Sequence, residues 1–184
     1  NEIIIINQPA IVPAIYRLVN KFLKYAVEMM LLKKICVIGS INTDIVTTVD
    51  TFPVPGQTVK AKGFGIYPGG KGGNQCIAAG RLGGIVSMIG KVGDDVYGTN
   101  YIDNLKKNNI DIKGVGIEEN TPSGLALINV SATGENIITI VAGANEKVNI
   151  EHIEKNIDII KESQIVLFQL EIPIKTLVYA IKAV

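Results

Sequence analysis

The sequence has no tryptophan, and aromatic residues make up only 5% of it. Its core must therefore rest on Ile, Val, Leu and Ala, and 184 residues of which 47% are hydrophobic are enough for a globular domain. Charge of one sign is also lacking, because the formal net charge is +1. No basic surplus indicates a nucleic-acid partner, and no acidic run indicates a solvating tail.

Cysteine and histidine are scarce. Cys36 and Cys76 form no CxxC pair and lie in apolar surroundings, which indicates buried free thiols in a reducing compartment. The single histidine, His152, lies in a polar helical segment without a partner in view, so we expect neither a catalytic nor a metal-binding role. Arg17 ends the longest uncharged run near the start, short of the ~20 residues of a spanning helix. With no secretory signal evident, we expect a cytoplasmic protein that contacts neither membrane nor nucleic acid.

Residues 1–32 differ in pattern from the rest of the chain. Apolar residues recur there at helical spacing, with basic and polar residues on another face: Ile11, Ile15, Leu18, Phe22, Ala26 and Met29. A basic amphipathic helix suits a membrane surface or a partner, but packing against its own chain or an extension without a role is favoured. We therefore predict a helical extension over residues 1–32 and a separate domain over residues 33–184.

From Lys33 onward, short apolar runs alternate with segments of helical pattern. The apolar runs predict buried strands at residues 34–39, 85–89 and 165–168. The helical patterns predict helices at residues 75–82, 97–107, 150–161 and from Pro173 to the end. Strands that alternate with helices indicate an α/β fold, with a parallel sheet flanked by helices.

Two parts of the chain have strand patterns with no helix between them. These short β-branched runs are separated by turn residues, and they lie at residues 45–49, 58–61, 125–130 and 136–141. They do not fit the alternation of strands and helices. We therefore expect a small second β-sheet, formed within about residues 45–66 and 125–141, that projects from the main sheet.

Polar residues gather at the predicted carboxyl ends of strands, where ligands bind in open parallel sheets. Asn42 and Asp44 follow the first predicted strand, Glu171 follows the strand at residues 165–168, and a glycine-rich loop at residues 69–74 precedes a helix. Carboxylates accept two hydrogen bonds, and amides both donate and accept. If these groups converge on one crevice, they suit a ligand with several hydroxyl groups.

The glycine-rich loop fails as a phosphate-binding P-loop. Gly65, Gly70 and Lys71 have the P-loop spacing, but Gly72 stands where Ser or Thr would hold magnesium. Small residues here instead allow the backbone to approach a ligand closely, with amide groups directed from a helix N-terminus.

Each of these residues also has an ordinary structural interpretation. Asn42 and Asp44 are typical turn or cap residues after a strand. Glu171 suits the first turn of the helix that starts at Pro173, because the helix dipole favours an acid there. Asp94-Asp95 is typical of a turn and helix cap. Taken singly, these interpretations are favoured for most of the residues, and it is the combination that favours a binding site.

The domain from Lys33 to the end is similar to the ribokinase-like, or PfkB, carbohydrate kinases. Seven segments occur in the order seen in that family: Gly39-Ser-Ile-Asn-Thr-Asp44, Pro53-Val-Pro-Gly-Gln-Thr58, Gly69-Gly-Lys-Gly-Gly-Asn-Gln75, Ala78-Ala-Gly-Arg-Leu-Gly83, Gly93-Asp-Asp95, Ala142-Gly-Ala-Asn145 and Gln169-Leu-Glu171. The resemblance implies an α/β core and a β-sheet lid that closes over the sugar and commonly forms a homodimer contact. It also implies six sugar-binding residues: Asn42, Asp44, Gly70, Lys71, Asn74 and Glu171.

The resemblance further implies ATP-dependent phosphorylation of D-ribose to ribose 5-phosphate, with magnesium and a monovalent cation such as potassium. A fructokinase-like enzyme for another sugar is an alternative. In this family the aspartate base, the nucleotide pocket and the cation site come later in the chain, and none of them is found before Val184. We therefore expect the sugar-binding half of a kinase, truncated on its C-terminal side, with no catalytic residue or metal site and no activity alone. A non-catalytic sugar-binding or dimerising fragment is the other alternative.

Overall fold

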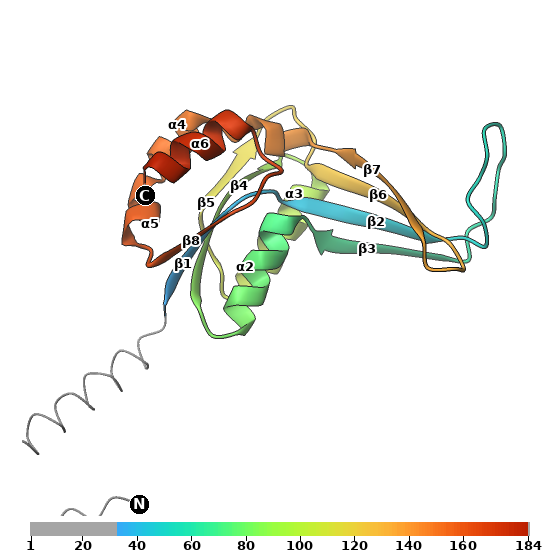
Figure 1. The fold of residues 1–184 in the computed structure, drawn as a ribbon, viewed down its shortest axis with the longest axis horizontal. Helices are drawn as coiled ribbons and strands as arrows, with labels where there is room; N and C mark the ends of the chain where they lie inside the picture. The colour runs from blue at the N-terminus through green and yellow to red at the C-terminus, as the bar shows by residue number, and fades with distance from the viewer. Residues whose placement is uncertain (1–32, 184) are drawn as a thin grey trace, which may run out of the picture. The chain divides into compact units, whose positions relative to one another are not determined.

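The computed structural model describes residues 33–183, and the helix predicted within residues 1–32 lies outside this range. Four parallel strands form the main sheet in the order β5-β4-β1-β8. Their bounds are β1 Lys34–Ile38, β4 Ile85–Gly93, β5 Asp111–Glu118 and β8 Ile165–Phe168. Because the four strands are parallel, their carboxyl ends lie at one edge of the sheet, as predicted for an α/β fold (Figure 1).

Helices cover both faces of the main sheet (Figure 1). One face is covered by α2 Lys71–Arg81 and α3 Val96–Lys107, and the other by α4 Ile150–Lys155, α5 Ile157–Glu162 and α6 Ile174–Lys182. The described helices include none long and apolar enough to cross a bilayer.

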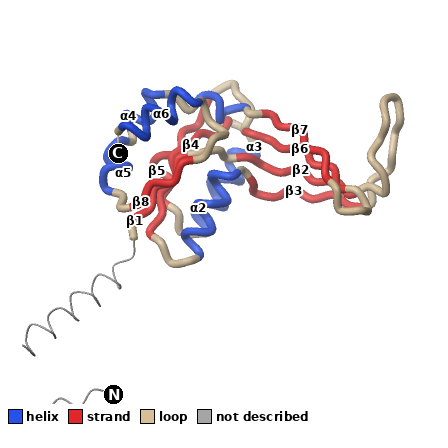
Figure 2. The backbone as a smooth tube through the Cα atoms, in the orientation of Figure 1, coloured by secondary structure: helices blue, strands red, loops and turns tan. Residues whose placement is uncertain are grey.

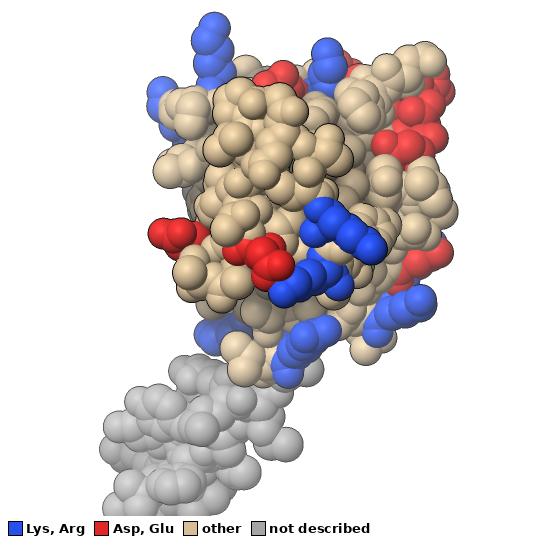
Figure 3. All heavy atoms as spheres, turned by 90° about the vertical axis from the view of Figure 1, so that its right-hand side faces the viewer, with Lys and Arg blue, Asp and Glu red and all other residues tan. Residues whose placement is uncertain are grey.

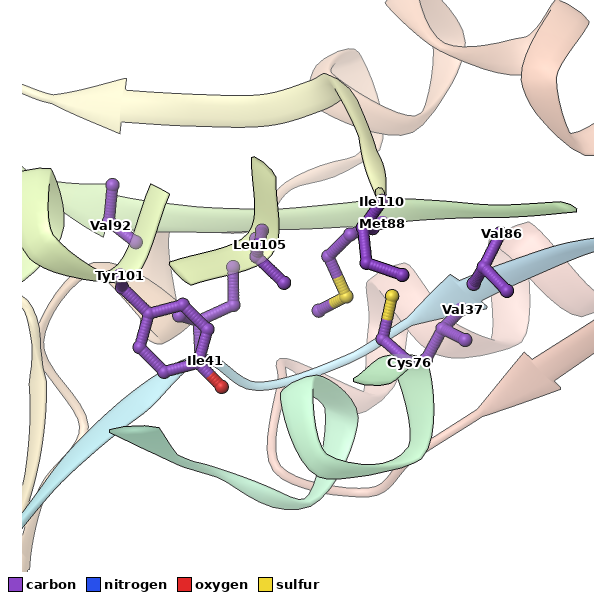
Figure 4. Packing of buried hydrophobic residues seen from close by; sticks show 9 residues of the cluster. All are labelled: Val37, Ile41, Cys76, Val86, Met88, Val92, Tyr101, Leu105 and Ile110. Atoms are coloured by element: carbon purple, nitrogen blue, oxygen red, sulfur yellow. The ribbon is translucent and has the colours of Figure 1, made fainter. Parts of the chain in front are cut away.

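The core consists of two apolar clusters, one on each face of the sheet. Alternation along β1 separates them, because Val37 packs under α2 and α3 while Cys36 and Ile38 pack under the other helices. Figure 4 shows the first cluster, in which Cys76 and Leu105 of the two helices lie over the sheet. Cys36 and Cys76 are buried free thiols, as predicted, and burial raises the pKa of each to about 12.

A second sheet of four strands forms the lid, in the order β3-β2-β6-β7 (Figure 2). Its strands are β2 Asn42–Thr48, β3 Gly63–Gly69, β6 Gly124–Val130 and β7 Asn136–Val141. The hairpin of β6 and β7 confirms the predicted strand pair around Gly134. A 3-10 helix, η1 Gly143–Lys147, follows β7. The lid is wider than predicted, because it starts at Asn42 and its first part ends at Gly69.

Several boundaries differ from the prediction. Residues 58–61 form no strand, and the second lid strand is β3, which the pattern missed because three glycines and Pro68 give it low β-propensity. The structure adds β5, which contains Gly114, Gly116 and three charged residues. The helix predicted at residues 150–161 divides at Asn156, whose side chain donates to the His152 carbonyl.

The helix that follows the glycine-rich loop begins at Lys71, four residues before the predicted start at Gln75. Glycine is a poor helix former, so Gly72 and Gly73 hid the first turn from a pattern-based prediction. Lys71 and Asn74 therefore lie on a helix and not in a loop.

His152 connects helix α4 to the sheet. Its Nε2 lies 3.1 Å from the Gly90 carbonyl oxygen and 3.0 Å from the Gly114 carbonyl oxygen. Both partners only accept, so Nε2 carries the proton and bridges β4 and β5 beside a register shift. The histidine does have partners, and its contacts are structural.

We expect the pKa of His152 to lie below its ordinary value of 6.5. Burial disfavours the charged ring, and Lys91 adds repulsion, while the two carbonyl contacts oppose the shift. The contribution of the neutral ring to stability is then complete above the unfolded pKa and is lost as the pH falls below it. Because this is the only histidine, an NMR titration of its ring protons in the folded chain measures the value directly. The urea-unfolded chain is the control, and a folded pKa equal to or above the unfolded pKa would contradict the expectation.

Candidate functional site

A pocket of about 160 Å³ lies where the carboxyl edge of the main sheet meets the lid. All six residues predicted to bind a ligand line it, together with four apolar lid residues. The ten lining residues are Asn42, Asp44, Gly70, Lys71, Asn74, Ala126, Ile128, Ile138, Ile140 and Glu171. The structure thus brings together residues that are up to 129 positions apart, between Asn42 and Glu171.

Asn42 and Asp44 lie on the first lid strand, β2, and not in a turn. They are two positions apart on the strand, so both face the pocket. Among residues 33–183, no hydrogen bond or ion pair reaches the Asp44 carboxylate, and burial together with repulsion from Glu171 raises its pKa above the ordinary 3.8. An acceptor held without a protein partner is available to hydroxyl groups of a ligand.

Glu171 joins three elements at the pocket. Its carboxylate accepts from the Ser40 hydroxyl at 2.7 Å and from the Lys71 ammonium group. Burial favours the neutral carboxyl, but these hydrogen bonds outweigh it and lower the pKa of Glu171 below its ordinary value. Glu171 is therefore more than a solvated residue in a first helical turn, because it ties the end of β8 to β1 and α2.

The glycine-rich segment brings the start of α2 against the chain that follows β1. Gly70 has a φ of +80°, and a Cβ there would lie 2.6 Å from the Asn42 nitrogen. Gly72 donates to the Ser40 hydroxyl oxygen at 3.4 Å, and Gly73 donates to the Ser40 carbonyl at 2.9 Å. Tyr101 donates to the Gly69 carbonyl at 2.5 Å. These contacts leave no space for a side chain at Gly70. Close packing therefore explains why this segment is rich in glycine.

The lid supplies the apolar part of the pocket. Ala126 is opposite Asp44 in the β2–β6 register and opposite Ile140 in the β6–β7 register, so the three share one face. Ile128 and Ile138 form the next pair on that face. The lid face that lines the pocket therefore carries polar side chains, Asn42 and Asp44, beside aliphatic ones, while Lys71, Asn74 and Glu171 come from α2 and the segment after β8.

Some residues of the site escaped the sequence interpretation. Ser40 is fully buried and holds Glu171, and Asn145 is 2% exposed and bonded to Asn42. Both lie within segments that resemble the carbohydrate kinases, but nothing in their spacing indicates their contacts. The apolar lining could have been found from the alternation along residues 125–130 and 136–141, once the lid sheet was expected.

Residues 32–183 match the sequence model of the pfkB family of carbohydrate kinases. The chain belongs to this family. Its pocket therefore lies in a PfkB domain, at the meeting of sheet and lid.

Three relatives place the chain within the PfkB family. It is 44% identical over 145 residues to a ribokinase of Bacillus subtilis, covering 79% of this chain and 49% of the relative. It is 39% identical over 148 residues to a deoxyribokinase of Salmonella typhi, covering 80% and 48%. The structure of an Arabidopsis thaliana ribokinase complexed with ribose and ATP has a TM-score of 0.76 at 31% identity, covering 83% of this chain and 50% of that one. The chain spans about half the length of these relatives.

We expect Gly70→Ala to destabilise the chain more than Gly56→Ala. Both positions have left-handed backbone, with φ of +80° and +81°, so each variant incurs about 1–2 kcal/mol of strain. Nothing lies within 4 Å of a Cβ at Gly56, whereas the Cβ at Gly70 meets the backbone of β2. Overpacking should add about 1–3 kcal/mol at Gly70 alone. Urea unfolding measures both free energies, and equal losses would contradict the packing argument.

Proposed function

We propose that this chain is the sugar-binding part of an ATP-dependent kinase that phosphorylates D-ribose to ribose 5-phosphate. The single observation that carries the proposal is the pocket, in which six polar or glycine residues from β2, α2 and the end of β8 meet under the lid. Ribose offers several hydroxyl groups, each both donor and acceptor. The pocket offers carboxylate acceptors, the Lys71 donor and two carboxamides, so the hydrogen-bonding capacities match.

The pocket assigns a role to each of its polar residues. Asp44 accepts from sugar hydroxyls, since its carboxylate has no other donor within the described residues. Asn42 can donate through its NH₂ group, since its oxygen already accepts from Asn145, and Asn74 can both donate and accept. Lys71 and Glu171 form a salt bridge, which fixes the orientation of both side chains before a ligand binds. A preformed arrangement lowers the ordering cost of binding.

D-ribose is favoured over other sugars by the relatives. The most similar curated proteins include ribokinases and a deoxyribokinase, and one structural neighbour was solved with ribose and ATP. A fructokinase-like specificity remains the alternative among kinases. The alternative that is not a kinase is a non-catalytic sugar-binding or dimerising module. It predicts that ribose binds but is never phosphorylated.

The chemistry of this pocket does not suit a nucleotide. The pocket contains two carboxylates, Asp44 and Glu171, which repel a polyphosphate, and the helix start lacks the Ser or Thr of a P-loop. No group of three acidic, His or Cys residues within residues 33–183 is arranged to hold a metal ion. We therefore assign no residue here to ATP, magnesium or potassium.

We also propose that the lid forms the contact of a cytoplasmic homodimer. The lid face turned away from the pocket carries exposed apolar side chains, with Phe64 69% exposed and Ile137 50% exposed. Figure 3 views the molecule from the far end of the lid, where charged side chains of both signs lie around an uncharged area. Burial of such apolar side chains favours association. The two free thiols suit a reducing compartment.

We expect the chain to bind D-ribose and Asp44→Asn to weaken that binding about tenfold or more. The change keeps the shape of the side chain but removes a charged acceptor, and hydrogen bonds to charged groups contribute about 1.5–3 kcal/mol. Asp50→Asn is the matched control, because Asp50 is an exposed lid residue 64% accessible and paired with Lys62. Titration calorimetry measures all three dissociation constants. No ribose binding by the wild-type chain, or equal weakening by both variants, would refute the assignment.

We expect the 184-residue chain alone to form no ribose phosphate at ordinary kinase rates. Phosphoryl transfer needs a base at the attacking hydroxyl and donors at the transferred group, and the pocket provides no such set for a nucleotide. The assay combines the chain with ATP, magnesium, potassium and D-ribose, with a complete ribokinase as positive control. Product formed at about 1–100 per second would contradict the expectation.

A further inference from the structure

Asn145 makes three hydrogen bonds beneath the pocket. Its Oδ1 accepts from the Ile41 backbone nitrogen at 2.8 Å, and its Nδ2 donates to the Ile41 carbonyl at 3.1 Å. The same Nδ2 donates to Oδ1 of Asn42 at 2.7 Å. Asn145 is 2% exposed and lies on η1, just after the last lid strand. It therefore connects the exit of the lid to the chain that enters it.

The backbone of Ile41 leaves only one orientation for the Asn145 amide. A backbone N–H only donates and a carbonyl only accepts, so Asn145 must turn its oxygen to the first and its NH₂ group to the second. The remaining hydrogen on Nδ2 then requires an acceptor from Asn42. The orientation of both amides thus follows from chemistry and does not depend on how their oxygen and nitrogen atoms were assigned.

The consequence for the pocket is the orientation of Asn42. Because its oxygen accepts from Asn145, the NH₂ group of Asn42 is the end left for the pocket, and no acceptor within residues 33–183 binds it. Two positions along the strand, Asp44 presents acceptors only. A donor and an acceptor therefore lie on the same face of β2, two positions apart, and can serve different hydroxyl groups of one ligand.

The backbone of β6 packs closely against the side-chain amides of Asn42 and Asn145. A Cβ at Gly124 would lie 2.2 Å from Asn145 Nδ2 and 2.2 Å from Asn42 Oδ1. The start of β6 therefore closes over the pair of amides, which limits their freedom to turn.

We propose that Asn145 is a positioning residue, which fixes the Asn42 amide so that the pocket meets a donor beside the Asp44 acceptor. The inference rests on the proposed function for its ligand, D-ribose. Asn145 does not line the pocket, so its effect on binding passes through Asn42.

A double-mutant cycle with D-ribose tests the proposal. Asn145→Ala and Asn42→Ala should each raise the dissociation constant about tenfold, the effect of one hydrogen bond. The double variant should bind within about twofold of Asn42→Ala, since Asn145 has nothing left to position. The proposal would be overturned if the increases in dissociation constant of the two single variants multiply in the double variant. It would also be overturned if Asn145→Ala binds ribose as tightly as the wild-type chain.

Thr176→Val is the matched control for general destabilisation. Thr176 is 3% exposed, and its hydroxyl donates to the Val148 carbonyl at 2.9 Å, so the variant removes a buried side-chain hydrogen bond next to η1 without touching Asn42. It should lower the melting temperature and leave ribose affinity unchanged. A loss of affinity equal to that of Asn145→Ala would assign the effect to stability and overturn the positioning role.

Amide exchange in the wild-type chain gives a readout that needs neither a folded variant nor ribose binding. The side-chain NH₂ protons of Asn145 should exchange slowly with solvent, because both are hydrogen-bonded and buried, and those of Asn42 should exchange fast. Fast exchange at Asn145, or slow exchange at Asn42, would overturn the inference. If the exchange pattern is as expected but the wild-type chain does not bind ribose, the amide positioning stands and the proposed function fails.

Discussion

The parallel pairing of β1 with both β4 and β8 determines where the polar groups of the pocket lie. Ile38 is opposite Ile89 on one side and Phe168 on the other, so the three strands reach the same edge together. Ser40 and Glu171 follow two of these strand ends, and their hydrogen bond is possible because the register brings the ends side by side. The buried strands thus position the polar groups that follow them. A shift of one residue in this register would separate them.

Electrostatics then divides the two carboxylates of the pocket into different roles. Glu171 is stabilised in its charged form by Lys71 and Ser40, whereas Asp44 receives no donor within the described part of the chain and is raised in pKa by burial. The Lys71–Glu171 pair is only partly buried, so its energetic value is small. Its effect is geometric, because it holds the start of α2 against the end of β8.

Much of the main sheet was predictable from the sequence, for a clear physical reason. Strands β1 and β8 are continuous apolar runs, because both faces of the main sheet are covered. Asp95, predicted as a helix cap, is the N-cap of α3, and its side chain accepts from the Gly98 backbone nitrogen. Three of the failures occur where glycine interrupts the pattern. The lid strand β3, the strand β5 and the first turn of α2 all contain glycines that serve close packing. Tertiary contacts favour these segments against their intrinsic propensity.

The six predicted residues of the pocket could be found from the sequence because each follows a strand end or belongs to the glycine-rich segment. Ser40 and Asn145 could not be found in this way. Their contribution is a pair of hydrogen bonds across more than a hundred positions, from Ser40 to Glu171 and from Asn145 to Ile41. Such contacts depend on the three-dimensional register and leave no local spacing. A buried polar residue of this kind is visible in a sequence only as an exception to an apolar pattern.

The lid brings polar and apolar residues of the pocket together on one sheet. Asp44 lies on β2, and its register partner Ala126 lies on β6. Any displacement of this sheet therefore moves the Asp44 carboxylate and the aliphatic side chains of the lid together. Ile138 and Ile140 remain 47% and 56% exposed, and a ligand in the pocket would bury part of that surface at about 25 cal/mol per Å². The directional groups and the apolar surface thus favour the same position of the lid. In the proposed function, a ligand that contacts only the polar groups or only the apolar side chains of this sheet would obtain only part of the binding energy.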